Sequence, residues 1–571
     1  MLERPRALLG SAILILSAAA LAAACGNSEE LRPLPVGAGG AGGTGGAGGA
    51  GSTSVGGGGA GGCSEDCSDE KLYVGAAKQL INPTIIESEW EDLIANNHYD
   101  PGEPFTDVNA NNVFDATWIA GFGNARPATG SNDDLEVRAI ALRRGDTTVV
   151  FCVLDVVGYF VDEMDRIRMD PEVLALDVDH ILIGSTHTHE GVDTVGLWGP
   201  NQLTSGRSAE YQALTRERAA LAIKEAVEAL APARMRIAQT ITAEAGGTLN
   251  YVNDTRDPII YDPTLTIAQF TEEADPTRTI GTLVNWASHP EYGGSGNNLL
   301  SADYVHWLRE VIEVGVPADS LPGIGGTTVF VQGPLGGQIG PGGGVHPLGP
   351  DGVPITEAGL PRAQAAGTSV AKLALVALQK DGVDVPAQDT LITYREVMIE
   401  ARIDNIGYYF FSEQGIFDRK FYNFDDTMPL GPDNPPWARL PLSYLQVGPM
   451  ATITAPGELH PELWLGGYDG SSSWGQSMLT ETVNAPDMST APKGPYLRDL
   501  MLSNPGVKYA FVAGLTQDFL GYIVPSFNYV LHPDNPYFEE ADGDHYEETN
   551  SIGPQVEEHI QHPMMTLATP R

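Results

Sequence analysis

The chain reads Ile181-Leu-Ile-Gly-Ser-Thr-His-Thr-His-Glu190, a short apolar run that ends in two histidines. The run has the length and composition of a buried β-strand. In an extended chain, residues two apart face the same side, so the imidazoles of His187 and His189 can reach one site. The stretch therefore predicts a strand of a buried sheet with polar chemistry at its end.

Further apolar runs of strand length lie on both sides of this one. They cover residues 147–157, 265–270, 279–287, 327–331, 444–454 and 509–514. Segments with helical periodicity, rich in Ala and Leu and polar on one side, lie at residues 208–230 and 355–379. The alternation predicts an α/β or mixed α+β fold with a central mixed β-sheet flanked by helices. Functional groups in such folds cluster in loops beyond strand ends.

The composition of the chain limits its possible partners, and its organisation limits the number of domains. The chain has 571 residues, and its 32 Lys plus Arg against 74 Asp plus Glu give a net charge of −42. Nucleic acid is excluded as a partner, because so acidic a surface would be repelled by phosphates. Residues 71–571 contain neither an internal repeat nor a Pro/Ser-rich linker, so we expect a single large catalytic domain there.

The N-terminal part is typical of an exported protein. Residues 1–24 combine a basic start, an apolar run and three alanines, as in a signal peptide. Cys25 follows directly, which resembles a bacterial lipoprotein signal whose Cys carries the lipid, although Leu21 lies one place early. An ordinary cleaved signal is the alternative. Residues 25–70 include a Gly-rich flexible tether. We expect a protein lipid-anchored to a bacterial membrane, on its periplasmic or cell-surface face.

Metal-ligand residue types occur at the ends of three of the predicted strands. Besides the first pair of histidines, His289 ends the run of residues 279–289, and Glu458 follows the run that ends near residue 454. Neutral imidazole and carboxylate are suitable ligands for Zn²⁺, and catalytic zinc sites keep one position open for water. The alternative is that these histidines are only hydrogen-bonded and that the glutamate is solvated.

The chain resembles the neutral/alkaline (non-lysosomal) ceramidase family in pieces that occur in the same order. They are Thr186-His-Thr-His189, Asn285-Trp-Ala-Ser-His-Pro290, Pro456-Gly-Glu458, and Tyr522-Ile-Val-Pro525 with His545-Tyr-Glu-Glu548. The likeness runs from about residue 73 to residue 560 and covers most of the predicted domain.

The resemblance implies one zinc ion held by His187, His289, Glu458 and Tyr522. It also implies three residues beside the substrate carbonyl, which are His189, Arg256 and Tyr546. The spacing of the two tyrosines is lengthened by an insertion at residues 532–544. A strand-end tyrosine that packs on the sheet is therefore the alternative interpretation of Tyr522.

Two departures from the family concern the substrate. The family's nucleophilic serine lies in a Gly-Asp-Val-Ser-Pro motif, and the corresponding Gln332-Gly-Pro-Leu-Gly-Gly-Gln-Ile-Gly-Pro341 places Gly340 where that serine belongs. A hydroxyl nucleophile is therefore missing. We also expect the chain to lack the family's immunoglobulin-like C-terminal domain.

We predict a zinc-dependent hydrolase that cleaves the amide bond of an N-acyl lipid, as an N-acylsphingosine amidohydrolase does, by metal-activated water. Arg256, Tyr546 or His189 would stabilise the oxyanion, and His189 would protonate the leaving nitrogen. One alternative is a zinc esterase or amidase for a small soluble substrate. Another is a non-catalytic surface lipoprotein that kept the fold.

Two further features have alternatives of their own. Aromatic residues could line a groove for an acyl chain, although aromatics at such spacings more often pack in a core; they are Trp198, residues 408–411, Phe417, Phe421, Tyr422 and Phe424. Asp107, Asn109, Asn111 and Asp115 occupy positions 1, 3, 5 and 9 of a calcium-loop pattern, but position 6 is not Gly and position 12 is not Glu. An Asx-rich turn is the alternative to calcium.

Overall fold

The computed structural model describes residues 71–242, 251–254, 256–340, 346–474 and 483–571. The predicted signal peptide, Cys25 and the tether lie outside these residues, so the predicted domain boundaries stay predictions. Within the part of the chain that the structure describes, no helix is long and apolar enough to cross a membrane.

A large mixed β-sheet forms the centre of the molecule. Its strands follow the order β12-β8-β7-β6-β1-β3-β4-β5, and β13 pairs with β6. The pairs β4–β5 and β8–β12 are parallel, and the other pairs of the sheet are antiparallel. The strands are β1 (Leu72–Leu80), β3 (Glu136–Arg144), β4 (Thr147–Leu154), β5 (His180–Ser185), β6 (Ala231–Ile241), β7 (Thr264–Glu272), β8 (Thr279–Trp286), β12 (Thr327–Gln332) and β13 (Val383–Val385).

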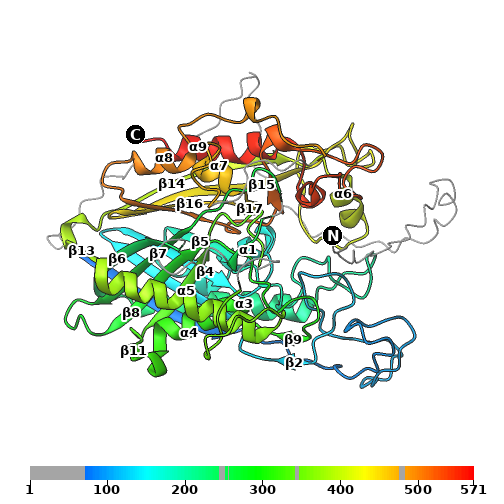
Figure 1. Ribbon diagram of the computed structural model, residues 1–571, viewed down its shortest axis with the longest axis horizontal. Helices are drawn as coiled ribbons and strands as arrows, with labels where there is room; N and C mark the ends of the chain where they lie inside the picture. Colours follow the sequence, from blue (N-terminus) through cyan, green and yellow to red (C-terminus); the bar gives the residue numbers. More distant parts are fainter. Residues whose placement is uncertain (1–70, 243–250, 255, 341–345, 475–482) are drawn as a thin grey trace, which may run out of the picture. The chain divides into compact units, whose positions relative to one another are not determined.

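A second sheet lies over the first (Figure 1). It has the order β14 (Ile392–Arg402), β15 (Trp437–Val447), β16 (Met450–Thr454) and β18 (Tyr509–Ala513). The prediction of one strand over residues 444–454 was wrong, because a two-residue turn at Gly448, with φ of 57°, folds this stretch into a hairpin. A shared core of apolar residues joins the two sheets, including Phe270 from the first and Phe511 from the second.

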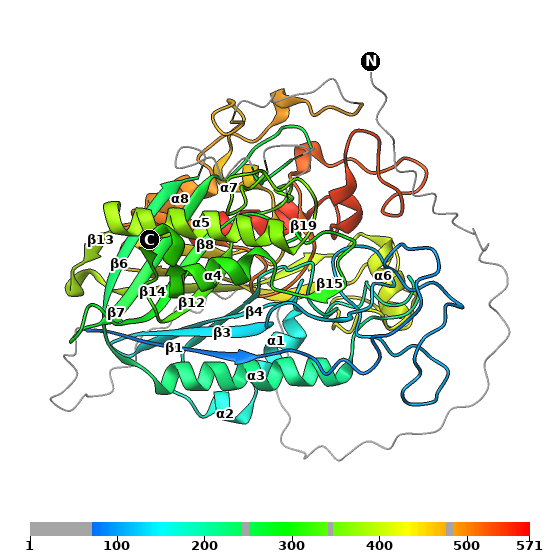
Figure 2. The same ribbon diagram turned by 60° about the horizontal axis from the view of Figure 1, so that its bottom comes forward.

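Helices cover the outer faces of both sheets (Figures 1 and 2). Helix α3 (Ala209–Glu228) packs on β1 and β3, and α4 (Tyr304–Val314) and α5 (Leu360–Asp381) share a core with β7, β8 and β12. The predicted helix at residues 355–379 begins later, at Leu360, because Gly359 has a φ of 150° and Pro361 stands in the first turn. The second sheet is covered by α7 (Pro461–Leu465), α8 (Leu497–Leu502) and α9 (His562–Ala568). The predicted mixed α/β fold is confirmed.

The remaining elements are short. The helices α1 (Val161–Arg168), α2 (Pro171–Leu174) and α6 (Ile406–Glu413) lie in connections between strands. Pairs of two-residue strands are β2 (Gly130–Ser131) with β9 (Leu299–Leu300), β10 (Gly315–Val316) with β11 (Leu321–Pro322), and β17 (Glu458–Leu459) with β19 (Tyr522–Ile523). The last pair carries two of the predicted ligands.

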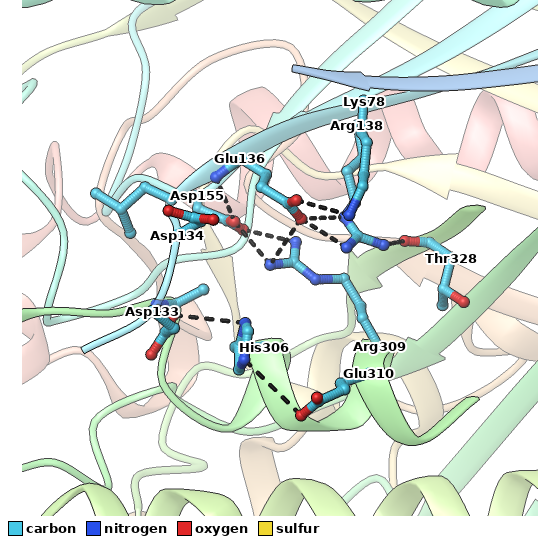
Figure 3. Close-up of polar contacts among 12 residues, drawn as sticks. Lys78, Asp133, Asp134, Glu136, Arg138, Asp155, His306, Arg309, Glu310 and Thr328 are labelled. Atoms are coloured by element: carbon cyan, nitrogen blue, oxygen red, sulfur yellow. Dashed lines mark hydrogen bonds and ion pairs between the residues drawn. The ribbon is translucent and has the colours of Figure 1, made fainter. Parts of the chain in front are cut away.

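A buried ion-pair network ties α4 to the large sheet (Figure 3). Arg309 on α4 makes a bidentate pair with Asp155, which follows β4, at 2.9 and 2.7 Å. On β3, Glu136 pairs with Arg138 at 2.6 Å and with Lys78 of β1 at 2.8 Å. Burial opposes the charge of Glu136, yet the cations of Arg309, Arg138 and Lys78 hold its pKa at about 2, below the ordinary 4.5. Native Glu136 is therefore ionised at neutral pH.

We expect Glu136 to contribute to acid unfolding. Because its pKa is lower in the folded state, its stabilisation is complete above pH 4.5 and is lost as pH falls towards 2. Glu136→Gln removes the charged partner of Arg138 and Lys78, while Arg138 keeps its pair with Glu313 and Arg309 its pair with Asp155, and should cost roughly 2 kcal/mol of unfolding free energy at pH 7. The difference between the wild type and this variant should shrink as pH falls from 4.5 to 2, measured by urea unfolding. An equal difference at every pH would contradict the assignment. Glu228→Gln, which alters an exposed pair with Lys224, is the control.

Candidate functional site

His187 is placed by the loop that follows β5. Its backbone N–H donates to Val156 O at 3.0 Å, and its ring Nδ1–H donates to Val157 O at 2.6 Å. Since the proton is on Nδ1, the lone pair of Nε2 faces inward. The backbone at His187 has a φ of 70°, so the chain from His187 to His189 is not extended as expected. The two rings nevertheless lie 4.9 Å apart.

His289 is held in the same way at the end of β8. Both its backbone N–H and its Nδ1–H donate to Gln338 O, each at 3.0 Å. Its Nε2 therefore also presents a lone pair, on the side of His187 and His189. The side-chain nitrogens of the three histidines lie within 4.8 Å of one another, and all three residues are buried.

Glu458 and Tyr522 reach the same point from the other side. They are direct partners in the parallel pair β17–β19, so their side chains project from neighbouring positions of one small sheet. The Oε2 atom of Glu458 lies 3.1 Å from His289 Nε2 and 3.5 Å from His187 Nε2. The hydroxyl of Tyr522 lies 3.3 Å from His289 Nε2. The structure thus brings together all the side chains that the sequence predicts as ligands.

The spacing and chemistry of these atoms fit a divalent cation. Bonds of about 2.0 Å in tetrahedral geometry place neighbouring ligand atoms about 3.3 Å apart, close to the separations of 3.1–3.5 Å found here. Burial opposes ionisation of Glu458, but when protons rather than an ion lie between them, the imidazoles of His187 and His289 hold its pKa well below the ordinary range. Two nitrogen lone pairs and a carboxylate would repel one another without a cation between them. His187, His189 and His289 can therefore hold a metal ion.

Gln332 was not predicted from the sequence, and it aligns the two histidine loops. At the end of β12 its side-chain amide donates to Thr186 O and Ser288 O, each at 3.0 Å. These carbonyls lie next to His187 and His289. Because β12 and β5 are at opposite ends of the strand order, this bond also joins the two edges of the sheet. The sequence contained one signal for Gln332, which is that this polar residue directly follows the apolar run of residues 327–331.

Arg256 lies in a buried cluster of its own. It forms a bidentate pair with Glu548, at 2.8 Å for both contacts, and donates to Asn528 O. Glu548 belongs to the turn that carries Tyr546, whose hydroxyl lies 2.6 Å from that of Tyr522. The structure therefore gives Arg256 a positioning role for this turn. Its predicted contact with a substrate carbonyl stays a prediction, as does that of Tyr546.

Gly340 faces a carboxylate where the resemblance places a serine. The Gly340 N–H donates to Glu291 Oε1 at 2.6 Å. A Cβ atom added at Gly340 would lie 2.9 Å from Glu291 Cγ, closer than carbon atoms approach. Glu291 follows His289 by two residues and was not singled out in the sequence. Its side chain and any side chain at residue 340 compete for the same space.

Most of the predicted aromatic residues lie in or against a core, whereas Phe410 and Phe424 are exposed. Tyr408, Tyr409 and Phe417 are buried in the core under the second sheet, and Trp198, Phe411 and Phe421 pack against it. In the loop of residues 107–115, the amides of Asn109 and Asn111 both donate to Asp115 Oδ2 at 2.7 Å, and Asp107 accepts from the backbone of residues 111 and 112. The loop is an Asx-rich turn, and calcium binding stays a prediction.

No family model and no curated protein matches the chain. Among solved structures, a neutral ceramidase from Pseudomonas aeruginosa aligns with 88% of this chain and 74% of its own, with a TM-score of 0.58 and 13% identity. The chain has the neutral ceramidase fold. A ceramidase complexed with C2 aligns with 87% of this chain and 75% of its own, with a TM-score of 0.57 and 12% identity. At these identities the neutral ceramidase likeness establishes architecture alone.

We expect the backbone at His187 to carry strain in the metal-free protein. A non-glycine residue with positive φ costs about 1–2 kcal/mol, and glycine removes that cost. His187→Gly should therefore be more stable than His187→Ala by about 1 kcal/mol, measured by urea unfolding of both variants in chelator. Equal stabilities, or a more stable alanine variant, would show that the φ of 70° carries no strain.

Proposed function

We propose that the chain is a zinc-dependent hydrolase that cleaves the amide bond of an N-acyl, ceramide-like lipid. The observation that carries the proposal is the convergence of His187, His289, Glu458 and Tyr522 on one buried point within a neutral ceramidase fold. The proposal includes a predicted lipid anchor at Cys25, which would hold the enzyme to a bacterial membrane beside its substrate.

The predicted ligands and the neighbouring Tyr546 would have different roles in the reaction. His187, His289, Glu458 and Tyr522 would hold the ion, which when bound acts as a Lewis acid and supplies hydroxide near neutral pH. Tyr546, 42% exposed, lies at the solvent side of this cluster, with its hydroxyl against that of Tyr522. From there it can donate a hydrogen bond to the substrate carbonyl as negative charge develops on the oxygen.

His189 and Gly340 concern the protonation of the leaving nitrogen and the choice of nucleophile. The Nε2 atom of His189 lies 3.3 Å from His187 Nε2, close enough either to join the ion or to give a proton to the leaving nitrogen. With glycine at residue 340 the proposed reaction has no covalent acyl-enzyme step, so water attacks the carbonyl directly.

We expect substitution of His187 or Glu458 by Ala to abolish both metal binding and activity. Either change removes a ligand, so hydrolysis of N-acyl lipids should fall by more than about 100-fold, beyond the usual cost of losing an outer partner of a metal ligand. Zinc per chain by elemental analysis and fatty-acid release are the measurements. His532→Ala is the control, since His532 also faces a carboxylate, Glu539 at 3.6 Å, away from the site. Full zinc content and activity in both ligand variants would refute the proposal.

A panel of N-acyl amides and esters, long-chain and short-chain, separates the alternatives. Turnover of only the small soluble substrates would favour the alternative of an esterase or amidase for a small soluble substrate. Stoichiometric zinc with no turnover of any substrate would favour a binding or scaffolding protein.

We expect Gly340→Ser to create no ceramidase activity by itself. The new Cβ would lie 2.9 Å from Glu291 Cγ, so the added hydroxyl can be accommodated only if Glu291 moves. Ceramide turnover should not exceed that of the wild type, and Gly340→Ala should behave in the same way because it has the same steric conflict. A large gain with serine but not with alanine would contradict this expectation.

A further inference from the structure

The three histidines of the site differ in what fixes their rings. His187 and His289 each donate Nδ1–H to a backbone carbonyl, which leaves Nε2 free for an ion. The ring of His189 donates to no backbone carbonyl in the part of the chain that the structure describes. Its Nδ1 is buried and has no aligned hydrogen-bond partner among the described residues. A ligand histidine almost always has such a partner, because a metal on Nε2 requires the proton to be on Nδ1.

The carboxylate within reach of that nitrogen belongs to Glu291. Its Oε2 atom lies 3.4 Å from His189 Nδ1, while its Oε1 accepts the Gly340 N–H at 2.6 Å. Glu190, the neighbour of His189 in sequence, is engaged elsewhere, since it accepts from Asn297 at 2.7 Å and pairs with Arg126 at 3.6 Å. Glu291 is therefore the group placed to accept the Nδ1–H of His189.

The ring of His189 has little freedom to turn away from this position. A Cβ atom on Gly121, where φ is 103°, would lie 2.4 Å from the His189 side chain, so the ring rests directly against this backbone. Phe122 meets the ring edge-on with centroids 5.1 Å apart, and the His189 N–H donates to Pro290 O at 2.9 Å. Both ring nitrogens are thus confined, one beside Glu291 and the other beside His187 Nε2.

We propose that Glu291 is a positioning residue that makes His189 a further metal ligand. By accepting Nδ1–H it leaves the Nε2 lone pair of His189 for the ion, so that a third imidazole joins His187, His289, Glu458 and Tyr522 at the centre. The inference rests on the proposed function in so far as a divalent ion occupies the site. It departs from the proton-transfer role predicted for His189, because a ligand Nε2 has no proton to give. Tyr546 then remains as the hydroxyl donor at the solvent side.

The test measures Zn²⁺ and Co²⁺ affinity of the full chain by competition with a chelator. Glu291→Ala should weaken binding by about 10–100-fold, the usual loss when the outer partner of a ligand histidine is removed. Glu291→Gln should recover part of this loss, because its amide oxygen can still accept Nδ1–H, although its NH₂ group then faces the Gly340 N–H. The visible absorption of bound Co²⁺, which depends on coordination number and geometry, should change with alanine and return in part with glutamine.

A double-mutant cycle distinguishes positioning of His189 from a general structural effect. If Glu291 acts through His189, then Glu291→Ala should cost no further affinity in a His189→Ala background. Glu539→Ala, which removes a carboxylate 3.6 Å from His532 outside the site, is the matched control and should leave affinity unchanged. If Glu291→Ala lowers the melting temperature, Glu291→Asp provides a second variant that is too short to reach Nδ1 and should show the same loss.

The failures of the two proposals are distinguishable. A wild type that binds neither Zn²⁺ nor Co²⁺ refutes the proposed metal-dependent function and this inference with it. A wild type that binds the ions, with Glu291→Ala of equal affinity and an unchanged Co²⁺ spectrum, overturns only the role of Glu291. Additive losses in the double mutant overturn it as well, whereas metal binding without hydrolysis leaves it standing.

Discussion

The site is organised by two hydrogen bonds from imidazole to backbone. His187 donates to Val157 O and His289 donates to Gln338 O, and these bonds turn both Nε2 lone pairs towards Glu458. In a buried region of low dielectric, facing acceptors repel one another unless a proton or a cation lies between them. Burying them together is therefore favourable only with a positive charge at the centre, so binding of an ion there would be linked to the folding of these loops. The positive φ of His187 belongs to the same arrangement, since strain of this kind persists where neighbouring bonds determine the backbone.

The large sheet brings the two histidine loops together because a hydrogen bond links the ends of its two edge strands, β5 and β12. Strands β5 and β12 stand at opposite ends of the strand order, yet Gln332 at the end of β12 bonds to the carbonyl of Thr186 beyond β5. Asn285 of β8 extends the junction to the second sheet by donating to Val512 O at 3.0 Å. Below the loops, the pair of Arg309 with Asp155 anchors the segment whose next residues contact His187. The predicted ligands thus depend on contacts between elements distant in sequence, which explains how they can be 335 residues apart, from His187 to Tyr522, and still converge.

The sequence was informative where local periodicity and residue chemistry act together. Apolar runs ending in His187, His289 and Glu458 predicted both the strands and the side of the fold on which chemistry lies, and the structure brings those side chains together. It was not informative where tertiary packing decides. The turn at Gly448 falls within a continuous apolar run, and the partner of Arg256, Glu548, lies 292 residues away. Glu291 is one acidic residue among 74, and only its position against Gly340 distinguishes it.

The glycine at residue 340 and the glutamate at residue 291 are best understood as one feature. A side chain at residue 340 would occupy the space of Glu291 Cγ, so a serine there and a carboxylate at this place exclude each other without rearrangement. In the family that the chain resembles, the serine is the nucleophile; in this chain the backbone N–H at that position holds a carboxylate instead. Compared with that motif, this chain lacks a hydroxyl at residue 340 and has a carboxylate that faces His189 Nδ1, 3.4 Å away. Under the proposed function, water rather than a side chain would attack the carbonyl, and the ligand geometry would matter more, because the centre alone would orient that attack.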